Sequence, residues 1–357
     1  MSAKYKIFIL TALFILCFIF YAGICSEKLP ENIILGCSDK IVKLKFDPGS
    51  KSYIKKTEFL FNKDCLRQVE VCTGHLYVRT VNEILKFNGE LTDFTSKSFK
   101  KLESLAVNKK GVFVSADASF IAMDKDLKEL SRINIEKNAH DILIYNDTAY
   151  LLDNIIIPMY VLRVDIKDPS KVYILDKTRI SGINAHLDAQ WLVPESGLWM
   201  ILESYAHQGG YGQLINIHLM DDAGKVITRQ NIYRRSFYKE ELYEETEGFK
   251  MLGVSDTRPC FAVCEFYGKI RDLNKKYYIC RIKIDDKKIK AEKCLNLDYK
   301  NINTKVIIKE KNNFLFVMPQ MSGFLNMIDV KNGEKLLPSQ DIKKIIPDAK
   351  VIDLTVY

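Results

Sequence analysis

The stretch Ile41–Phe59, with the sequence IVKLKFDPGSKSYIKKTEF, has two runs of alternating apolar and polar residues on either side of the turn residues Asp47-Pro48-Gly49. Alternation with a period of two is typical of a β-strand with one buried face, and Asp, Pro and Gly favour a tight reversal of the chain. The stretch therefore predicts a β-hairpin whose first strand ends at an Asp.

Hairpins of this kind recur along the whole chain. Six further stretches have an apolar strand ending in Asp or Asn, a polar turn and a Lys-containing second strand: 84–99, 120–135, 161–180, 214–233, 278–297 and 324–338. Most are preceded by another apolar hairpin, as in 102–118, 140–154 and 305–319. Four antiparallel strands repeated in a chain with little helical periodicity are typical of a β-propeller. We therefore expect an all-β propeller of seven four-stranded blades, with six or eight blades as the alternatives.

The two ends of the chain predict how the ring of blades closes. The first repeat, which begins at Glu31, lacks an innermost strand, and the last repeat is followed by one extra strand, Ala349–Tyr357. A closed ring removes the unpaired sheet edges that promote aggregation. We therefore expect the C-terminal strand to complete the first blade.

The N-terminal segment indicates where the protein is located. Lys4 and Lys6 precede an uninterrupted apolar run, Ile7–Ile24. This layout is typical of a secretory signal peptide, and the run is also long enough to span a bilayer. We expect residues 1–25 to be a signal peptide or a membrane anchor. Residues 26–357 then form a single propeller domain that is periplasmic, displayed on the cell surface or secreted.

The fourth repeat carries a family resemblance. Val164-Asp165-Ile166, Asp168-Pro169 and Ala185-His186 resemble the LVIVD-type repeat of bacterial cell-surface β-propellers, and the last repeat matches this pattern in part. The resemblance implies an extracytoplasmic propeller of the binding or scaffolding type. It implies no catalytic residues.

Cysteines occur in several of the expected strands. An oxidising compartment permits disulfides. Cys280 and Cys294 are symmetric about the turn at Asp285–Lys288, whereas Cys264 and Cys280 are nearly symmetric about 270–274. Both pairings use Cys280, so at most one forms. The sequence leaves open the pairing of the whole set: Cys37, Cys65, Cys72, Cys260, Cys264, Cys280 and Cys294. No Cys-x-x-Cys occurs, which argues against zinc-ribbon and thioredoxin-like readings.

Candidate site residues gather on one expected face of the propeller. Loops that lead into innermost strands, and those between second and third strands, carry function because the scaffold holds them in place. The long polar examples are Glu203–Gln213, Arg234–Gly248 and Phe266–Lys276, in blades four to six. His140 and His186 each end an Asn-Ala-His tripeptide at the start of an innermost strand. The candidate ligand-binding residues are His140, His186, Asp188, Glu203, Tyr205, His207 and Tyr211.

Three interpretations of these residues stay open. The two tripeptides are explained by repetition of a strand entry, and Tyr205, His207 and Tyr211 suit stacking on a sugar or a peptide. Alternatively, imidazoles and carboxylates could hold a divalent metal at the mouth of the central channel: His140, Asp141, His186, Asp188, Glu203 and His207. Asp188 and Glu203 are also the one carboxylate pair that suggests glycan hydrolysis.

Net charge narrows the class of partner. The chain carries a formal net charge of +8, but its basic residues are scattered among acidic ones. This pattern argues against nucleic-acid binding. We expect a propeller without cofactor or metal that binds a protein, peptide or glycan through the loops of blades four to six. A metal-dependent or carboxylate-based hydrolase or lyase at the channel mouth is the alternative.

Overall fold

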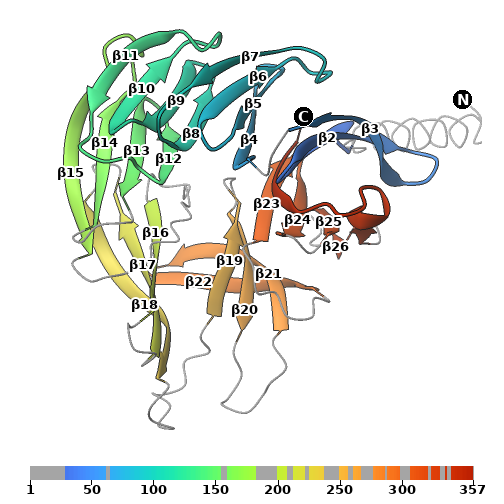
Figure 1. Cartoon of the computed structure of the whole chain (residues 1–357). Helices are drawn as coiled ribbons and strands as arrows, with labels where there is room; N and C mark the ends of the chain where they lie inside the picture. The colour runs from blue at the N-terminus through green and yellow to red at the C-terminus, as the bar shows by residue number, and fades with distance from the viewer. Residues whose placement is uncertain are drawn as a thin grey trace, which may run out of the picture.

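The computed structural model describes residues 29–356 apart from 62–64, 154–158, 182–198, 207–211, 222–224, 237–248, 256–259, 267–275, 286–287, 298–305, 321–322, 330–333 and 336–338. Its strands form separate antiparallel sheets that follow one another around a ring, as a β-propeller does (Figure 1). The fold class expected from the sequence is confirmed.

Seven sheets are present among the described residues, and we number them as blades along the chain. The strands of each blade, from the innermost outward, are as follows. Blade 1 has β28 (Val351–Val356), β1 (Asn32–Cys37), β2 (Lys40–Asp47) and β3 (Ser52–Leu60); blade 2 has β4 (Gln68–Cys72), β5 (His75–Arg79), β6 (Glu83–Phe87) and β7 (Phe94–Ser98); blade 3 has β8 (Leu102–Asn108), β9 (Gly111–Ala116), β10 (Ser119–Met123) and β11 (Glu129–Asn134); blade 4 has β12 (Asp141–Tyr145), β13 (Thr148–Asp153), β14 (Met159–Asp165) and β15 (Tyr173–Ser181).

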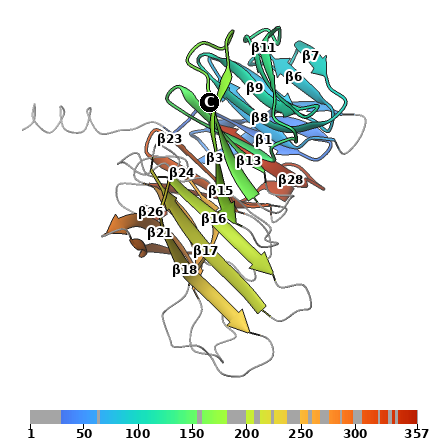
Figure 2. The ribbon, with the colours of Figure 1, turned by 90° about the vertical axis from the view of Figure 1, so that its left-hand side faces the viewer.

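The remaining blades lie in the second half of the chain. Blade 5 has β16 (Trp199–Ala206), β17 (Gly212–Met220) and β18 (Val226–Ser236); blade 6 has β19 (Phe249–Val254), β20 (Phe261–Phe266), β21 (Lys276–Asp285) and β22 (Lys288–Leu297); blade 7 has β23 (Val306–Lys311), β24 (Phe314–Pro319), β25 (Phe324–Asp329) and β26 (Glu334–Lys335), with β27 (Gln340–Asp341) also paired to β25. Figure 2 shows β16, β17 and β18 lying side by side.

The predicted blade count needs one correction. Seven four-stranded blades were expected, but only six sheets reach four strands. Blade 5 has three strands within the described residues, and they correspond to the second, third and fourth strands of the other blades, since β17 and β18 form the expected hairpin. All seven hairpins expected from the sequence pair as antiparallel strands, and in blades 1–4, 6 and 7 they are the third and fourth strands.

Closure of the first blade is confirmed. β28 pairs with β1 in antiparallel register, with Leu354 opposite Leu35 and Val356 opposite Ile33. The order β28-β1-β2-β3 therefore completes a four-stranded sheet from the two ends of the chain. Innermost strands of consecutive blades then contact one another from β19 through β23, β28, β4 and β8 to β12.

The recurring Asp or Asn has a structural role in the outer hairpins. The Asp47 carboxylate accepts hydrogen bonds from the amides of Gly49 and Ser50, at 3.2 and 3.1 Å. In the equivalent turns, the Asn88 side chain accepts from the Thr92 amide and the Asp124 carboxylate accepts from Asp126 and Lys128. Short side-chain acceptors close such turns without a backbone partner. This requirement explains the sequence repeat.

Apolar clusters lie between the blades and hold them together. Ile34 and Ile41 of blade 1 pack in one cluster with Leu76 and Phe87 of blade 2, all fully buried. Similar clusters join blades 2 and 3, blades 3 and 4, blades 6 and 7, and blades 7 and 1. Among these described clusters, the sheets of blades 1, 2, 3 and 7 are therefore buried on both faces by packing against the blades on either side.

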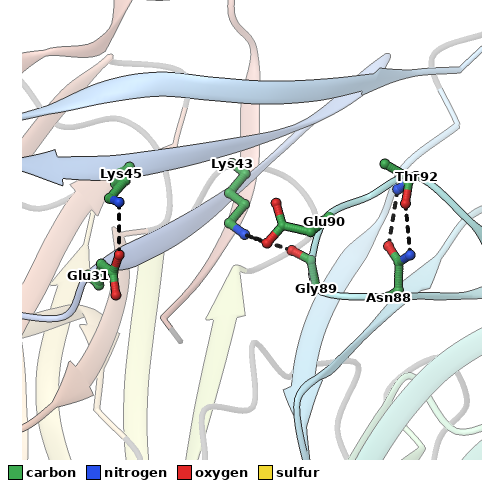
Figure 3. Close-up of polar contacts among 7 residues, drawn as sticks. All are labelled: Glu31, Lys43, Lys45, Asn88, Gly89, Glu90 and Thr92. Atoms are coloured by element: carbon green, nitrogen blue, oxygen red, sulfur yellow. Dashed lines mark hydrogen bonds and ion pairs between the residues drawn. The ribbon is translucent and has the colours of Figure 1, made fainter.

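Lysine side chains also bridge blades. Lys43 of β2 reaches the outer turn of blade 2, where its Nζ donates to the Gly89 carbonyl at 2.8 Å and to the Glu90 carboxylate at 2.9 Å (Figure 3). In the same way, Lys86 of blade 2 reaches Asp126 of blade 3 at 2.6 Å. Lys110 of blade 3 reaches Asp147 of blade 4. We call Lys43, Lys86 and Lys110 the lysine bridges.

Helical structure is confined to one turn within the described part of the chain, the 3₁₀ turn η1 (Ile342–Lys344). Among these residues no helix is long and apolar enough to cross a membrane. The expected signal peptide or anchor, residues 1–25, lies outside them, so it stays a prediction.

Candidate functional site

The two faces of the ring differ in what they carry. In an antiparallel blade the innermost strand begins at the same edge at which the second strand ends and the third begins. We call this edge the mouth face, and the opposite edge, with the turns after Asp47, Asn88 and Asp124, the hairpin face. The ends of β16, β18 and β20 and the starts of β17, β19 and β21 all lie at the mouth face. The long segments singled out in the sequence therefore start and end at this face.

The residue just before each innermost strand occupies an equivalent place in blades 1 to 4. The Arg67 amide donates to the Arg79 carbonyl at 2.8 Å, and the His140 amide donates to the Leu152 carbonyl at 2.9 Å. In the other two blades the carbonyls of Lys350 and Lys101 accept from Ser38 and Asp117. These four entry residues, Lys350, Arg67, Lys101 and His140, are all basic or titratable, and all lie at the mouth face.

The first Asn-Ala-His tripeptide is largely a structural connection between blades 3 and 4. The Asn138 side chain accepts from the Ala118 amide at 2.7 Å. Ala139 is 3% exposed, its amide donates to the Ser115 hydroxyl, and its carbonyl accepts from the Ser104 hydroxyl. A small residue is needed here because β8 and β9 of blade 3 both lie against it. The structure thus supports the strand-entry interpretation for Asn138 and Ala139, and it places His140 at the mouth.

Polar side chains at the inner strands reach the next blade. Asp353 of β28 accepts from the Val69 amide of β4 at 2.9 Å. Gln68 of β4 donates to the Leu105 carbonyl of β8 at 2.9 Å. Ser104 of β8 continues the series through its bond to Ala139. We call Asp353, Gln68 and Ser104 the inner links. Each inner link is a hydrogen bond to a backbone group of a buried residue. These backbone groups lie at the inner side of a blade, where no further strand is available to pair with them.

A charged set surrounds Arg79 at this face. The Arg79 Nε donates to the Gln68 side-chain oxygen at 3.3 Å. Burial lowers the pKa of the Arg79 guanidinium to about 10, opposed by the nearby carboxylates of Glu103, Asp141 and Asp353 and reinforced by Arg67. Arg79 therefore keeps its charge at neutral pH. It lies in an environment that has removed much of its water, where charged hydrogen bonds are stronger than at the surface.

Each predicted site residue can now be placed. His140 precedes β12 at the mouth face, as expected. Glu203 and Tyr205 belong to strand β16, opposite Asn216 and Leu214, so their assignment to a loop was wrong. The strong apolar alternation of the facing strand 214–220 extends the pairing to Ala206 and Gln213. His186, Asp188, His207 and Tyr211 lie outside the described residues, and their roles stay predictions.

The other two long loops are also shorter than the sequence indicated. Arg234–Ser236 ends strand β18, while Phe266 and Lys276 are paired residues of β20 and β21. The polar residues in these positions predicted loops. They form strands instead, because pairing with a neighbouring strand satisfies the backbone whatever the side chains are.

Metal binding has no support within the described part of the chain, where no group of three or more His, Cys, Asp or Glu side chains could hold an ion. Two of the three imidazoles proposed as ligands, those of His186 and His207, are outside it. The metal alternative and the enzyme alternative therefore stay untested.

Arg67 and Arg79 were not among the candidate residues expected from the sequence. Arg67 could have been found from the sequence. When the repeats are aligned on the residue before each innermost strand, Arg67 takes the same position as His140. Arg79 could not be found in this way. Its equivalent in blade 4 is Leu152, and only the folded ring places acidic residues from three blades beside it.

Comparisons with known proteins support the fold. No protein-family model matches the chain, and no curated protein matches it, so the resemblance to LVIVD-type repeats is unconfirmed. The chain is similar to solved β-propellers. One is a candidate 6-phosphogluconolactonase from Bacteroides uniformis (10% identity, TM-score 0.54, covering 91% of this chain and 99% of that one).

Two further solved structures are similar to the chain. A functionally unknown protein from Desulfotomaculum acetoxidans has 9% identity and a TM-score of 0.51, covering 91% of this chain and 98% of that one. BamB from Moraxella catarrhalis has 10% identity and a TM-score of 0.47, covering 92% and 87%. Likeness at this level of identity concerns architecture alone. The class defined by the fold and the site is a β-propeller with a charged mouth face.

Proposed function

We propose that this protein is a non-catalytic extracytoplasmic propeller that binds an extended polypeptide segment of a partner protein at its mouth face. The observation that carries the proposal is the set of charged side chains around Arg79, with basic entry residues from four consecutive blades on the same edge. The arginines Arg67 and Arg79 would bond acidic groups of the partner, for which a guanidinium has the matching geometry.

A polypeptide fits this face better than the other ligand classes. Glu103, Asp141 and Asp353 balance the charge of the arginines, so the mouth carries both signs. Mixed charges suit a peptide, which offers donors, acceptors and both kinds of ionised side chain. A nucleic acid would require a surface of one sign. The segments 207–211, 237–248 and 267–275 leave from the same edge, and we propose that they extend the binding surface over blades four to six.

The proposed location rests on the N-terminal sequence. Lys4, Lys6 and the apolar run Ile7–Ile24 have the layout of an export signal. Reporter fusions test this directly: we expect a phosphatase that is active only outside the cytoplasm to be active when fused after residue 357. An active cytoplasmic reporter at the same position would contradict the proposal.

Peptide-array binding tests the mouth. The purified 26–357 chain should select peptides that contain Asp or Glu, and R67Q together with R79Q should reduce binding of the best peptides at least tenfold. The matched control is Lys45→Gln, since Lys45 is a half-exposed lysine paired with Glu31 on blade 1. Retention of full affinity in the double arginine variant would refute the mouth as the binding site.

A second variant tests the loops of blades four to six. Residues 207–211 are replaced by Gly-Ser, which preserves the pairing of Ala206 with Gln213. We expect weaker binding of the same peptides with an unchanged unfolding midpoint. If this variant binds as tightly as the unaltered chain, residues 207–211 are not part of the binding surface.

A further inference from the structure

Blade 6 buries three thiols in one apolar cluster. Cys264 and Cys280 are fully buried and Cys260 is 8% exposed, and they pack together with Met251, Ala262 and Ile282. Free thiols at these positions behave as small apolar side chains. The chain also has an export-type N-terminus, which makes disulfide formation relevant. The positions of the cysteines in the structure discriminate between the two pairings that the sequence left open.

The strand register brings Cys264 and Cys280 together. Cys264 of β20 is opposite Tyr278 of β21, and Cys280 is opposite Ala262. Cys280 therefore lies diagonally across the β20–β21 pair from Cys264, and the hydrogen bond from the Ile282 amide to the Cys260 carbonyl places Cys260 on the other diagonal. Because side chains two residues apart share a face of the sheet, both thiols point to the same side. Both are free thiols in the structure, and the Cys280 thiol donates to the Tyr278 carbonyl at 3.9 Å.

The alternative partner, Cys294, is placed differently. On β22 the register runs from Ile279 opposite Leu295 to Cys280 opposite Lys293, so Cys294 falls at an irregularity between the two strands. Cys294 is exposed, and its thiol lies 3.4 Å from the Glu292 carbonyl, to which it donates. An exposed thiol and a fully buried thiol at a bulge are poorly placed for the bond that the hairpin symmetry suggested.

We propose that Cys264 and Cys280 form a disulfide bond when the protein folds outside the cytoplasm. The inference rests on the extracytoplasmic location proposed above and is independent of the binding site. Each thiol loses its proton, and the two sulfurs together give up two electrons as the S–S bond forms. The oxidant is itself a disulfide, that of an oxidoreductase or of glutathione, and it is reduced to two thiols.

Burial of the thiols decides at which stage of folding the disulfide forms. Burial, reinforced by the neighbouring Cys280 thiol, raises the pKa of the Cys264 thiol well above its usual value. Only a thiolate attacks a disulfide, so the packed blade reacts slowly. The bond therefore forms while the β20–β21 hairpin is still open to the oxidant, and the completed ring then shields it from reduction.

Oxidative refolding tests the proposal. The full chain is unfolded and reduced, refolded with reduced and oxidised glutathione, denatured, alkylated, digested and analysed by mass spectrometry. We expect a cross-linked peptide pair containing Cys264 and Cys280, lighter than the two free peptides by two hydrogen atoms, and an alkylated Cys294. Alkylation of both Cys264 and Cys280, or a link between Cys280 and either Cys260 or Cys294, would overturn the proposal.

Alanine variants keep the test decisive if the wild-type chain refolds with a low yield. Cys294→Ala should retain the link, whereas Cys264→Ala and Cys280→Ala should each abolish it without creating another. A thermal unfolding midpoint that falls on reduction of the wild-type chain, but not of the C264A/C280A double variant, would support the bond. Equal shifts in both would contradict it. Failure of peptide binding at the mouth would leave all these outcomes unchanged.

Discussion

Neighbouring blades are joined in two different ways, by the inner links at the inner strands and by the lysine bridges, which reach turns of the hairpin face. The inner links Asp353, Gln68 and Ser104 bond backbone groups of Val69, Leu105 and Ala139, which are all nearly or fully buried. The lysine bridges instead end on exposed carboxylates, such as Glu90, whose side chain is 66% exposed. Water replaces the partner of an exposed group at little cost, but it cannot reach a buried amide. The inner links should therefore contribute more to stability than the lysine bridges.

The largest effect is expected where inner strands come closest. A Cβ atom on Gly253 of β19 would overlap the Val306 carbonyl oxygen of β23. Gly253→Ala therefore forces two inner strands apart and should lower the free energy of unfolding by about 3 kcal/mol, measured by chemical denaturation. Gly49→Ala, in an exposed turn of the hairpin face, is the control and should change stability little. Equal midpoints for the two variants would contradict the close approach.

Removal of an inner link should come next. Asp353→Ala leaves the buried Val69 amide without its acceptor and should lower the free energy of unfolding by about 2 kcal/mol in the same measurement. Asp353→Asn keeps one oxygen at this position and should lose less than half as much. Identical losses in both variants would show that the hydrogen bond is not the cause.

Lysine bridges should matter less, and two lysines of β2 allow a direct comparison (Figure 3). The Lys43 side chain is 8% exposed, so Lys43→Ala removes buried packing of its stem as well as two hydrogen bonds, for a loss of about 1.5 kcal/mol. Lys45, paired with Glu31, has a side chain that is 47% exposed, and Lys45→Ala should show no measurable loss of stability. A larger loss for Lys45→Ala would reverse the argument.

The smallest effect is expected in a turn of the hairpin face, and it should depend on pH. Hydrogen bonds from the Ser50 hydroxyl and from the Ser50 and Gly49 amides lower the pKa of Asp47. A carboxyl whose pKa is lowered by folding stabilises the fold above its unfolded pKa, and this contribution is lost as the pH falls through the folded value. Asp47→Asn should therefore be slightly less stable at pH 7, and the difference should vanish in acid. Asn88→Asp, in the equivalent turn of blade 2, should be slightly more stable than the unaltered chain at pH 7, and this gain should vanish in acid.

Much of the architecture could be predicted because its signals are local. The hairpin at Ile41–Phe59 and its repeats depend on alternation and on a turn acceptor, which are all within reach of one short segment. Closure by Ala349–Tyr357 could be predicted by counting strands. The position of His140 followed from the repeat. The lengths of the loops near Glu203 and Phe266 could not be predicted, because pairing with a neighbouring strand overrides their polar composition.

The sequence by itself determined that this chain forms a ring of antiparallel blades, and which strand closes it. Only the tertiary structure decided what lies at the mouth face. Asp353 accepts a hydrogen bond from Val69 across 284 residues of chain, and carboxylates from three blades act electrostatically on Arg79. No local sequence pattern predicts these contacts between blades, because the packing of one blade against the next decides which side chains lie close together. The same holds for the thiols of Cys264 and Cys280, which come together through the register of β20 and β21.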